Sequence, residues 1–498
     1  MRYLLNAAQM KACDASTIKQ FRMPSIVLME RAALAVRDTV LKRYPDAEKI
    51  LVICGSGNNG GDGYAAARLL HLAGKKVRVL FVGKHDHRTE QTVLQAEIYR
   101  RYGGVELPDE ASLKGYDLIL DALFGIGLKR EVIGRYADVI SAVNRVDTPV
   151  VSIDIPSGVS ADSGQILGCG IRADLTVTMQ YEKLGQMLYP GAYCCGEIVK
   201  ADVGITDDGV EWSEEPVYAL ERRDLEDLLP VRRPDANKGT YGKLLVIAGA
   251  KDMAGAACLA GGAALRSGCG LVKILSDEAN RLILQTALPE ALFGAWPQGG
   301  DVSAHLEWAD AVAIGPGLGQ SDLSHSILSC VLSSWKGPLI MDADALNLAA
   351  KDPALIRNLP SDVVLTPHPA EMSRLLRGIG EEDWSTHQTA ADPVGAAGKC
   401  CEALGCVAVM KGARTVIAHD GQFWMNLSGN DGMACGGSGD VLTGIIGGLL
   451  AQGADPADAA KAGVLVHALA GDQAAMEKGR RAMKAQDLIT SLPEVLMI

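Results

Sequence analysis

The chain has 498 residues, about three times the length of an average domain, so two large domains or three ordinary ones are expected. Hydrophobic residues make up 48% and charged residues 22%, close to globular averages, which excludes a generally disordered protein. The net charge of −12 argues against a protein that binds nucleic acids or anionic membranes, since such proteins usually present a basic surface.

The cysteines and the apolar stretches indicate where such a protein resides. The twelve cysteines include no Cys-x-x-Cys pair, which favours free thiols in a reducing cytoplasm. Residues 1–20 contain no apolar core of signal-peptide length. Segment 441–454 is too short for a membrane span of about 20 residues, and segment 254–272 is interrupted by Arg266. We expect a soluble cytoplasmic protein.

Short β-branched segments alternate with helical patterns along the chain, which is typical of parallel α/β folds. In the first half, this pattern predicts helices at 64–72 and 88–102, and strands at 49–54, 77–82, 117–121, 149–154 and 173–179. Segment 206–216 carries five acidic residues and no basic one, as expected of a solvated linker. A second alternation predicts strands at 243–248, 271–276, 311–314, 338–342, 363–366 and 406–410, then helices from Val441 and at 456–478. We place two domains, 1–215 and 220–498.

A glycine-rich segment follows the first of these strands. Residues 55–60 read Gly-Ser-Gly-Asn-Asn-Gly, a G-x-G-x-x-G pattern between a strand and a helix. Such a turn lets a phosphate approach the backbone at the positive end of a helix, although a tight turn without a ligand has the same sequence. The second strand does not end in the acid that a ribose-binding dehydrogenase site needs, because Asp86 comes too late. An ordinary NAD-dehydrogenase site is therefore disfavoured.

Two later strands of the first half also end in polar or glycine-rich turns. Asp121 precedes the segment 125–131, and Asp154 precedes Ile-Pro-Ser-Gly. Ligands of open parallel sheets bind outside the carboxyl ends of strands, so these turns are expected to converge on one crevice. Asn59, Asp121 and Ser157 offer hard oxygen ligands that suit an alkali or alkaline-earth cation. The alternative is that Asp121 and Asp154 merely cap turns.

Together, these three motifs closely resemble the NAD(P)H-hydrate epimerase domain, the YjeF N-terminal domain, over about residues 1–210. The resemblance implies a Rossmann-like three-layer sandwich that interconverts the R and S epimers of hydrated NADH and NADPH. It also implies a potassium ion held by Asn59, Asp121 and Ser157. The implied nucleotide contacts are Asn58, Asn59, Gly60, Gly61, Asp62, Gly125, Ile126, Gly127, Leu128, Lys129, Arg130, Glu131 and Asp154. Asp154 is our candidate for the catalytic carboxylate, and ring opening and a transient iminium both remain possible routes.

The second half carries a glycine cluster, residues 436–439, directly before Asp440 and an apolar helix. Backbone N–H groups at such a helix start can hold a transferring phosphoryl group, and Asp440 can take a proton from an attacking hydroxyl. The alternative is that Asp440 is only a helix N-cap. Other polar turns follow the predicted strands at 315–319, 342–347, 366–371 and 411–415, which favours one nucleotide cleft. Individually, His368 also fits a rigid turn and Lys411 an ordinary surface lysine.

This half resembles the ribokinase-like superfamily and, within it, the ADP- or ATP-dependent NAD(P)H-hydrate dehydratase, the YjeF C-terminal domain. Segments 253–257, 264–268, 315–319 and 366–371 narrow the resemblance to the dehydratase. It implies a ribokinase-like α/β domain in which Ala256, Gly319, His368 and Asp440 contact the hydrated nucleotide. The implied ADP contacts are Lys411, Gly412, Ala413, Arg414, Thr415, Asn430, Gly437, Ser438 and Gly439.

The two resemblances imply a bifunctional repair enzyme, an isomerase joined to a lyase. Asp440 would activate the C6 hydroxyl of the S hydrate of NADH or NADPH (NADHX or NADPHX), which takes a phosphoryl group from ADP and then leaves as phosphate. We expect ADP rather than ATP, Mg²⁺ with the nucleotide, and a homo-oligomer, as in the relatives. The alternatives are a small-molecule kinase with a regulatory N-terminal domain, and an N-terminal half that only binds a nucleotide or a protein.

Overall fold

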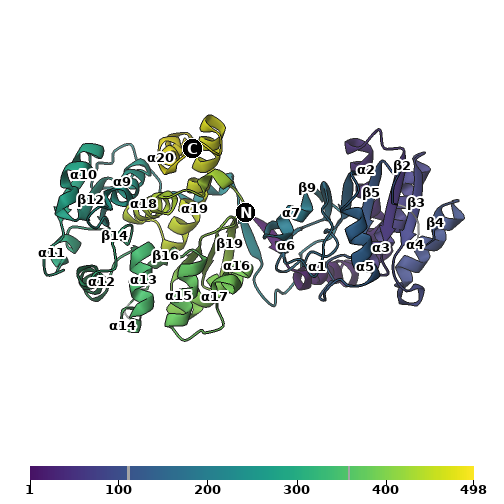
Figure 1. Ribbon diagram of the computed structural model, residues 1–498, viewed down its shortest axis with the longest axis horizontal. Helices are drawn as coiled ribbons and strands as arrows, with labels where there is room; N and C mark the ends of the chain where they lie inside the picture. The colour runs from purple at the N-terminus through teal and green to yellow at the C-terminus, as the bar shows by residue number, and fades with distance from the viewer. Residues whose placement is uncertain (109–112, 357–358, 498) are drawn as a thin grey trace. The chain divides into compact units, whose positions relative to one another are not determined.

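The computed structural model describes residues 1–108, 113–356 and 359–497. The chain forms two compact units, which we call the N-terminal unit (Tyr3–Val217) and the C-terminal unit (Tyr218–Ile498, with Met1–Arg2). Figure 1 shows the first in purple and blue and the second in teal, green and yellow. Among the described helices, every one falls short of the length and apolarity that a membrane crossing requires.

In the N-terminal unit, the described residues form a parallel sheet in the order β4-β3-β2-β5-β6-β7-β9. A short parallel pair, β1 with β8, accompanies it. The strands are β1 (Arg2–Leu5), β2 (Lys49–Cys54), β3 (Lys76–Phe81), β4 (Val105–Leu107), β5 (Leu118–Ala122), β6 (Val150–Ile153), β7 (Leu175–Met179), β8 (Glu182–Lys183) and β9 (Glu197–Ala201). The helices are α1 (Ala7–Lys19), α2 (Ser25–Arg43), α3 (Asn58–Leu72), α4 (Glu90–Arg101), α5 (Arg135–Val143), α6 (Leu184–Met187) and α7 (Gly191–Cys195).

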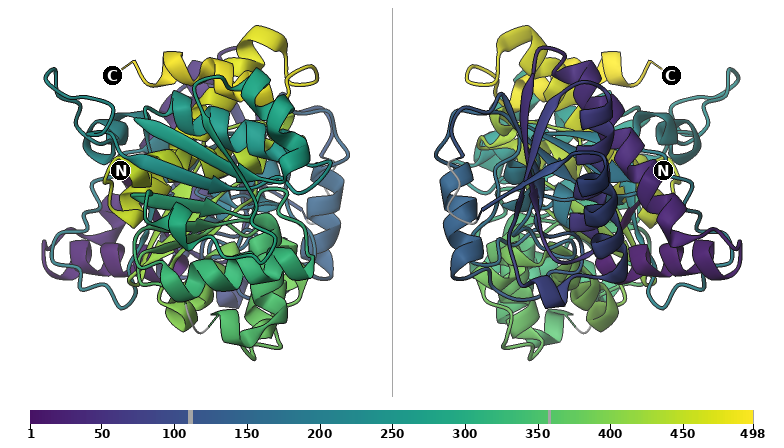
Figure 2. Two further views of the ribbon diagram at one scale, coloured as in Figure 1. Left: turned by 90° about the vertical axis from the view of Figure 1, so that its left-hand side faces the viewer. Right: turned by 90° about the vertical axis from the view of Figure 1, so that its right-hand side faces the viewer.

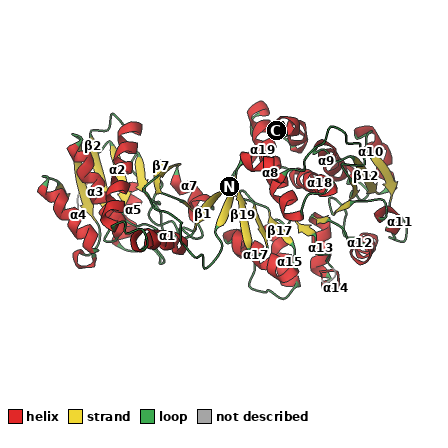
Figure 3. Cartoon of the chain, turned by 180° about the vertical axis from the view of Figure 1, so that it is seen from behind, coloured by secondary structure: helices red, strands yellow, loops and turns green. Residues whose placement is uncertain are grey.

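Helices cover both faces of this sheet. Val52 and Val79 point to the face that packs against α2, α3 and α4. Their neighbours Leu51 and Leu80 point to the opposite face, which packs against α5. Successive strand residues alternate between faces, so strands buried on both sides read as continuous apolar runs. The cartoon in Figure 3 distinguishes these helices and strands by colour.

In the C-terminal unit, strands run in the order β13-β12-β11-β14-β15-β16-β17-β18-β19, parallel as far as β17 and antiparallel from there. Figure 2 shows this sheet among its helices. The strands are β10 (Val217–Leu220), β11 (Lys243–Ile247), β12 (Leu271–Ser276), β13 (Leu292–Ala295), β14 (Ala311–Ile314), β15 (Leu339–Met341), β16 (Val363–Leu365), β17 (Val407–Met410), β18 (Val416–His419) and β19 (Gln422–Asn426). The helices are α8 (Leu225–Leu228), α9 (Ala254–Arg266), α10 (Arg281–Ala287), α11 (Ser303–Leu306), α12 (Asp322–Ser334), α13 (Ala343–Lys351), α14 (Pro353–Ile356), α15 (Pro369–Gly378), α16 (Thr386–Ala391), α17 (Pro393–Leu404), α18 (Ser438–Ala451), α19 (Pro456–Lys478) and α20 (Ala485–Val495).

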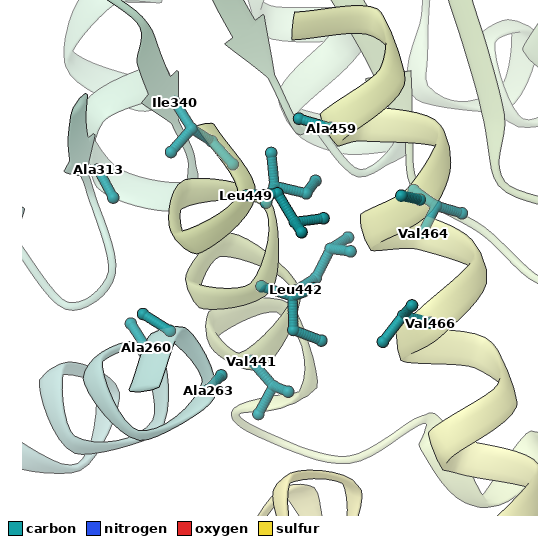
Figure 4. Close-up of a cluster of buried hydrophobic side chains, with 14 of the residues drawn as sticks. Ala260, Ala263, Ala313, Ile340, Val441, Leu442, Leu449, Ala459, Val464 and Val466 are labelled. Atoms are coloured by element: carbon teal, nitrogen blue, oxygen red, sulfur yellow. The ribbon is translucent and has the colours of Figure 1, made fainter. Parts of the chain in front are cut away.

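The core of the C-terminal unit surrounds helix α18. Val441 and Leu442 on this helix pack between α9, which contributes small alanines, and α19, which contributes Val464 and Val466 (Figure 4). Gly444 allows the close approach of α9, because a Cβ there would lie 2.1 Å from the Ala260 carbonyl oxygen. Tight packing on every side fixes the position of the helix start, where the predicted anion site lies.

The predicted α/β class with parallel sheets is confirmed, while two helix starts and the linker differ from expectation. Helix α3 begins at Asn58 rather than near Tyr64, so the predicted loop 58–62 is its first turn. Gly60 permits this, because a Cβ there would lie 2.0 Å from the Gly55 carbonyl oxygen. Helix α18 begins at Ser438 rather than Val441. The acidic linker is tied to α1, since Ser16 Oγ donates to the Asp208 carbonyl at 3.1 Å.

Candidate active sites

A pocket of about 160 Å³ lies in the N-terminal unit, beside the first turn of α3 and the end of β6. Its wall is apolar on the α2 side and polar around the strand ends. The lining residues are Met10, Lys11, Asp14, Ser25, Leu28, Met29, Ala32, Asn58, Asp62, Gln91, Ile126, Asp154, Met179, Val203 and Ile205. Four sequence-predicted residues are among them, namely Asn58, Asp62, Ile126 and Asp154. A mostly apolar pocket with a few convergent polar groups is the usual form of a small-molecule site.

Asp154 is held in this pocket by a lysine that the sequence analysis missed. The Lys183 side chain is fully buried, and its Nζ donates to Asp154 Oδ1. The same ammonium donates to Thr178 Oγ1 at 2.8 Å and to the Met179 carbonyl at 3.1 Å, so all three of its N–H groups are used. Met179 N also donates to Asp154 Oδ1, at 3.1 Å. One carboxylate oxygen is therefore occupied, and the hydrogen bonds among the described residues leave Oδ2 for a ligand.

The backbone of Asp154 adopts an unusual conformation. Its backbone has φ +69°, a left-handed conformation that residues other than glycine rarely adopt. Gln186 Nε2 supports this backbone by donating to the Asp154 carbonyl at 2.8 Å. Such a conformation costs free energy and persists where the surroundings enforce it, as at functional sites.

A second and a third carboxyl group share the pocket with Asp154. Burial raises the pKa of Asp62 well above its usual range, and the negative charges of Asp154 and Asp14 raise it further. Burial, together with Asp154, also raises the pKa of Asp14. The pocket thus combines a lysine-paired carboxylate with a second carboxyl group whose pKa is raised.

The three residues predicted to bind potassium lie together at the end of β5. Asp121 is 1% exposed, and its Oδ1 accepts from Ser157 Oγ at 2.6 Å. Ser157 N and Ser152 Oγ donate to Oδ2, at 2.8 and 2.9 Å. The Phe124 carbonyl accepts from Asn59 Nδ2 at 3.0 Å and from Ser157 Oγ at 3.3 Å. Burial raises the pKa of Asp121, although these hydrogen bonds lower it.

The predicted contact segment 125–131 is an irregular loop next to α3. A Cβ at Gly125 would lie 3.2 Å from Asn59 Cβ, so its start lies against the first turn of the helix. Ile126 reaches the pocket. Gly127, Lys129, Arg130 and Glu131 are exposed, and no residue from 127 to 131 lines the pocket.

In the C-terminal unit, Asp440 is the third residue of α18, and the N-cap is Gly437. The alternative that Asp440 is only an N-cap is therefore wrong. Gly437 has φ +91°, which turns the chain so that the glycine cluster presents backbone N–H groups at the helix start. Burial raises the pKa of Asp440 to about 6, Asp342 and Asp344 raise it, and Lys411 lowers it. A carboxyl group with this pKa is suited to accept a proton near neutral pH.

Lys411 is part of this cluster rather than an ordinary surface lysine. Its Nζ lies 2.6 Å from Asp342 Oδ1 and 3.9 Å from Glu371 Oε2. Thr443 Oγ1 donates to the other Asp342 oxygen at 2.7 Å. A Cβ at Gly439 would lie 3.4 Å from Lys411 Nζ, so the ammonium faces the glycine cluster.

The residues predicted to contact the hydrated nucleotide occupy turns at strand ends. His368 is the N-cap of α15, and its Nδ1 accepts from Ala370 N at 3.1 Å. Its role as a rigid turn element is thus real, while its side chain stays 48% exposed. Gly319 N donates to Asp344 Oδ2 at 2.9 Å. Ala256 lies on α9, where its Cβ would be 3.0 Å from a Cβ at Gly317.

The residues predicted to bind ADP lie in two segments, and hydrogen bonds hold each segment in place. Thr415 Oγ1 donates to the Gly412 carbonyl at 3.2 Å, and Arg414 Nη1 donates to the Leu427 carbonyl at 3.0 Å. Asn430 Nδ2 donates to Asp472 Oδ1 at 3.0 Å, so this side chain fixes the loop before α18. Ala413 is exposed in the first segment.

A half-buried histidine supports the start of α18, and no sequence motif singled it out. His467 on α19 lies with Nε2 2.9 Å from the Ser438 carbonyl. Burial lowers the pKa of His467 to about 4, and the charge of Lys411 contributes. The imidazole is therefore neutral near pH 7, and its Nε2–H donates to the carbonyl oxygen.

Comparison with known proteins assigns the family. The model of the YjeF-related protein N-terminus matches residues 25–185, and that of NAD(P)H-hydrate dehydratase matches residues 244–494. The bifunctional NAD(P)H-hydrate repair enzyme Nnr of Moorella thermoacetica is 37% identical over 99% of this chain and 96% of its own length. The chain belongs to the bifunctional NAD(P)H-hydrate repair enzymes.

A second bifunctional enzyme, a separate epimerase and a separate dehydratase agree with this assignment. The Escherichia coli Nnr is 38% identical, over 94% of this chain and 89% of its own. An NAD(P)H-hydrate epimerase of Limosilactobacillus fermentum is 50% identical over 40% of this chain and 95% of its own. The ADP/ATP-dependent NAD(P)H-hydrate dehydratase of Bacillus subtilis, crystallised with ATP and Mg²⁺, is 35% identical with a TM-score of 0.50, over 56% of this chain and 97% of its own. Both resemblances found in the sequence are confirmed.

Proposed function

We propose that the N-terminal unit epimerises hydrated NADH and NADPH, and that the C-terminal unit dehydrates the S epimer with ADP, giving AMP and phosphate. The observation that carries this proposal is the arrangement of Asp440 behind the glycine cluster, with its pKa raised to about 6 and Lys411 alongside. It joins a proton acceptor to an anion site, as phosphoryl transfer to a hydroxyl requires. Family membership favours repair over a small-molecule kinase.

In the C-terminal unit, Asp440 accepts the proton of the C6 hydroxyl of the S hydrate. The hydroxyl oxygen attacks the β-phosphorus of ADP, and AMP leaves. The C6–O bond then breaks with the phosphate as leaving group, and loss of a C5 proton restores the dihydronicotinamide. Ala256, Gly319 and His368 hold the hydrate.

The nucleotide lies along the segment Lys411, Gly412, Ala413, Arg414 and Thr415, with Asn430 and residues 437–439 enclosing its phosphates. Mg²⁺ supplies charge compensation for those phosphates when bound. No cluster of three or more His, Cys, Asp or Glu suited to a metal occurs among the described residues, so the ion is held through the nucleotide. Either ADP or ATP fits this description, and we expect ADP to be the donor.

In the N-terminal unit, Asn58, Asn59, Gly60, Gly61, Asp62 and the loop 125–131 hold the hydrated nucleotide, and Asp154 moves the proton. Asn59, Asp121 and Ser157 hold potassium. These residues fit a monovalent cation, because Asp121 is buried, forms no ion pair among the described residues and lies beside the Ser157 hydroxyl. We further propose a cytoplasmic homo-oligomer whose partners are NADHX, NADPHX and ADP.

The test uses a mixture of R and S NADHX with ADP, Mg²⁺ and K⁺, and follows the return of dihydronicotinamide absorbance. Wild type is expected to restore the whole pool. Asp440→Asn should restore no absorbance. Asp154→Asn should restore the S fraction quickly and the R fraction only slowly. If wild type restores no absorbance with ADP or ATP, or yields a stable phosphorylated product, the proposal is wrong.

A further inference from the structure

The pocket of the N-terminal unit holds three carboxyl groups but only one close cation. Asp14, Asp62 and Asp154 all line it. Lys183 pairs with Asp154, and its other two N–H groups donate to Thr178 and to the Met179 carbonyl. Arg68, on the same helix as Asp62, is paired with Glu30 at 2.5 Å. Lys11 also lines the pocket, but it is exposed and forms no ion pair among the described residues.

The charged groups around Asp154 differ from those around Asp62. Asp154 faces the buried Lys183 ammonium, which donates to its Oδ1. Asp62 forms no ion pair among the described residues, and burial followed by the negative charges of Asp154 and Asp14 raises its pKa well above the usual range. Two carboxyl groups whose surroundings differ in this way commonly divide the roles of base and acid.

We infer that Asp62 is a second catalytic residue of the N-terminal site, the proton donor that acts together with Asp154 as the base. This inference rests on the proposed epimerisation and names the groups that perform it. It goes beyond substrate binding, because it requires Asp62 to transfer a proton to the substrate.

The reaction needs one proton acceptor and one proton donor. Asp154 Oδ2 takes the proton of the C6 hydroxyl, and a C=O bond forms at C6 as the C6–N1 bond breaks. The electron pair of that bond passes to N1, which takes the proton of Asp62. After rotation about the C5–C6 bond, N1 attacks the other face of the aldehyde and both protons return. By the iminium route, Asp62 would protonate the departing hydroxyl and Asp154 would deprotonate the returning water.

The experiment measures conversion of purified R NADHX to the S epimer by the full chain with K⁺ and without ADP, so that dehydration does not consume the product. We expect Asp62→Asn to lower kcat about 100-fold to 10,000-fold, with little change in KM. Wild type should lose activity at high pH, where Asp62 is ionised. Asp62→Asn should lack this high-pH loss. Asp62→Glu should recover part of kcat and the high-pH loss.

Asp46→Asn is the matched control, because Asp46 is exposed between α2 and β2, and it should behave as wild type. A raised KM with unchanged kcat in Asp62→Asn would overturn the inference, as would a high-pH loss that survives the substitution. Near-UV circular dichroism and the KM of the variant establish that the pocket is folded. Failure of wild type to convert the R epimer would instead refute the proposed function.

Discussion

Lys411 Nζ lies 2.6 Å from Asp342 Oδ1, and the side chain of Asp342 is only 2% exposed. Its second oxygen accepts from Thr443 Oγ1 at 2.7 Å. This buried carboxylate therefore joins the end of β15 to the segment after β17 and to helix α18, the three elements that carry the candidate dehydratase site.

The first prediction concerns this pair. Asp342→Ala should lower the free energy of unfolding of the C-terminal unit by about 3 kcal/mol, because it removes the nearest partner of the half-buried Lys411 ammonium and leaves Glu371 at 3.9 Å. Urea unfolding followed by tryptophan fluorescence measures this, since five of the six tryptophans lie in that unit. Thr443→Val is the control and should cost about 1 kcal/mol, the usual value for one neutral hydrogen bond. Equal losses in both variants would show that the ion pair has no special role.

The second prediction is the pH dependence of dehydration. Asp440 must be ionised to accept a proton, and its pKa is raised to about 6. The kcat/KM for S NADHX, which reports the enzyme before the hydrate binds, should therefore be level above pH 7 and fall about tenfold per pH unit below 6. An ordinary aspartate would place this fall about two units lower. Asp440→Asn should lose activity at every pH, whereas Asp383→Asn, at an exposed position, should keep the wild-type profile.

The third prediction tests Lys183 as a positioning residue for Asp154. Lys183→Met keeps the length of the side chain but removes every N–H group that Asp154, Thr178 and Met179 accept from. We expect epimerisation to fall at least about 100-fold, the usual value of a positioned base. An unchanged kcat, measured on R NADHX without ADP, would exclude this role.

The fourth prediction concerns the turn before α18. Gly437→Ala should destabilise the C-terminal unit by about 1 to 3 kcal/mol and slow dehydration, because residue 437 has φ +91°. The new Cβ would also lie 2.3 Å from Leu259 Cδ1. Gly436→Ala is the matched control, since a Cβ there has open space around it. Similar thermal unfolding and similar rates for both variants would contradict the argument.

The fifth prediction concerns potassium. Ser157→Ala should raise the K⁺ concentration for half-maximal epimerisation about tenfold or more, as expected when one ligand of a small site is lost. Ser152→Ala is the control, because Ser152 also donates to Asp121 but is not a proposed ligand. The measurement is a K⁺ titration of R NADHX conversion. Activity independent of K⁺ in the wild type would show that no functional potassium is bound.

The sequence predicted the bounds of helices and strands well where a continuous apolar run or a clear helical pattern was present. The apolar runs of β2, β12 and β14 and the capped pattern of α19 have the predicted bounds. The starts of α3 and α18 were missed because glycines usually disfavour helices. In both cases tertiary contacts override this preference, since the close approach of Gly55 to Gly60 and of Ala260 to Gly444 leaves no room for a side chain.

The sequence by itself determined the fold class, the family and the motifs of both sites, because these depend on residue types at short spacings along the chain. Only the tertiary structure decided which side chains from elsewhere in the chain form hydrogen bonds to the residues of those motifs. Lys183 and His467 belong to no motif, yet one saturates an oxygen of Asp154 and the other supports Ser438. Proton affinity depends on burial and on charges brought together from distant segments, so the raised pKa of Asp62 arises only on folding.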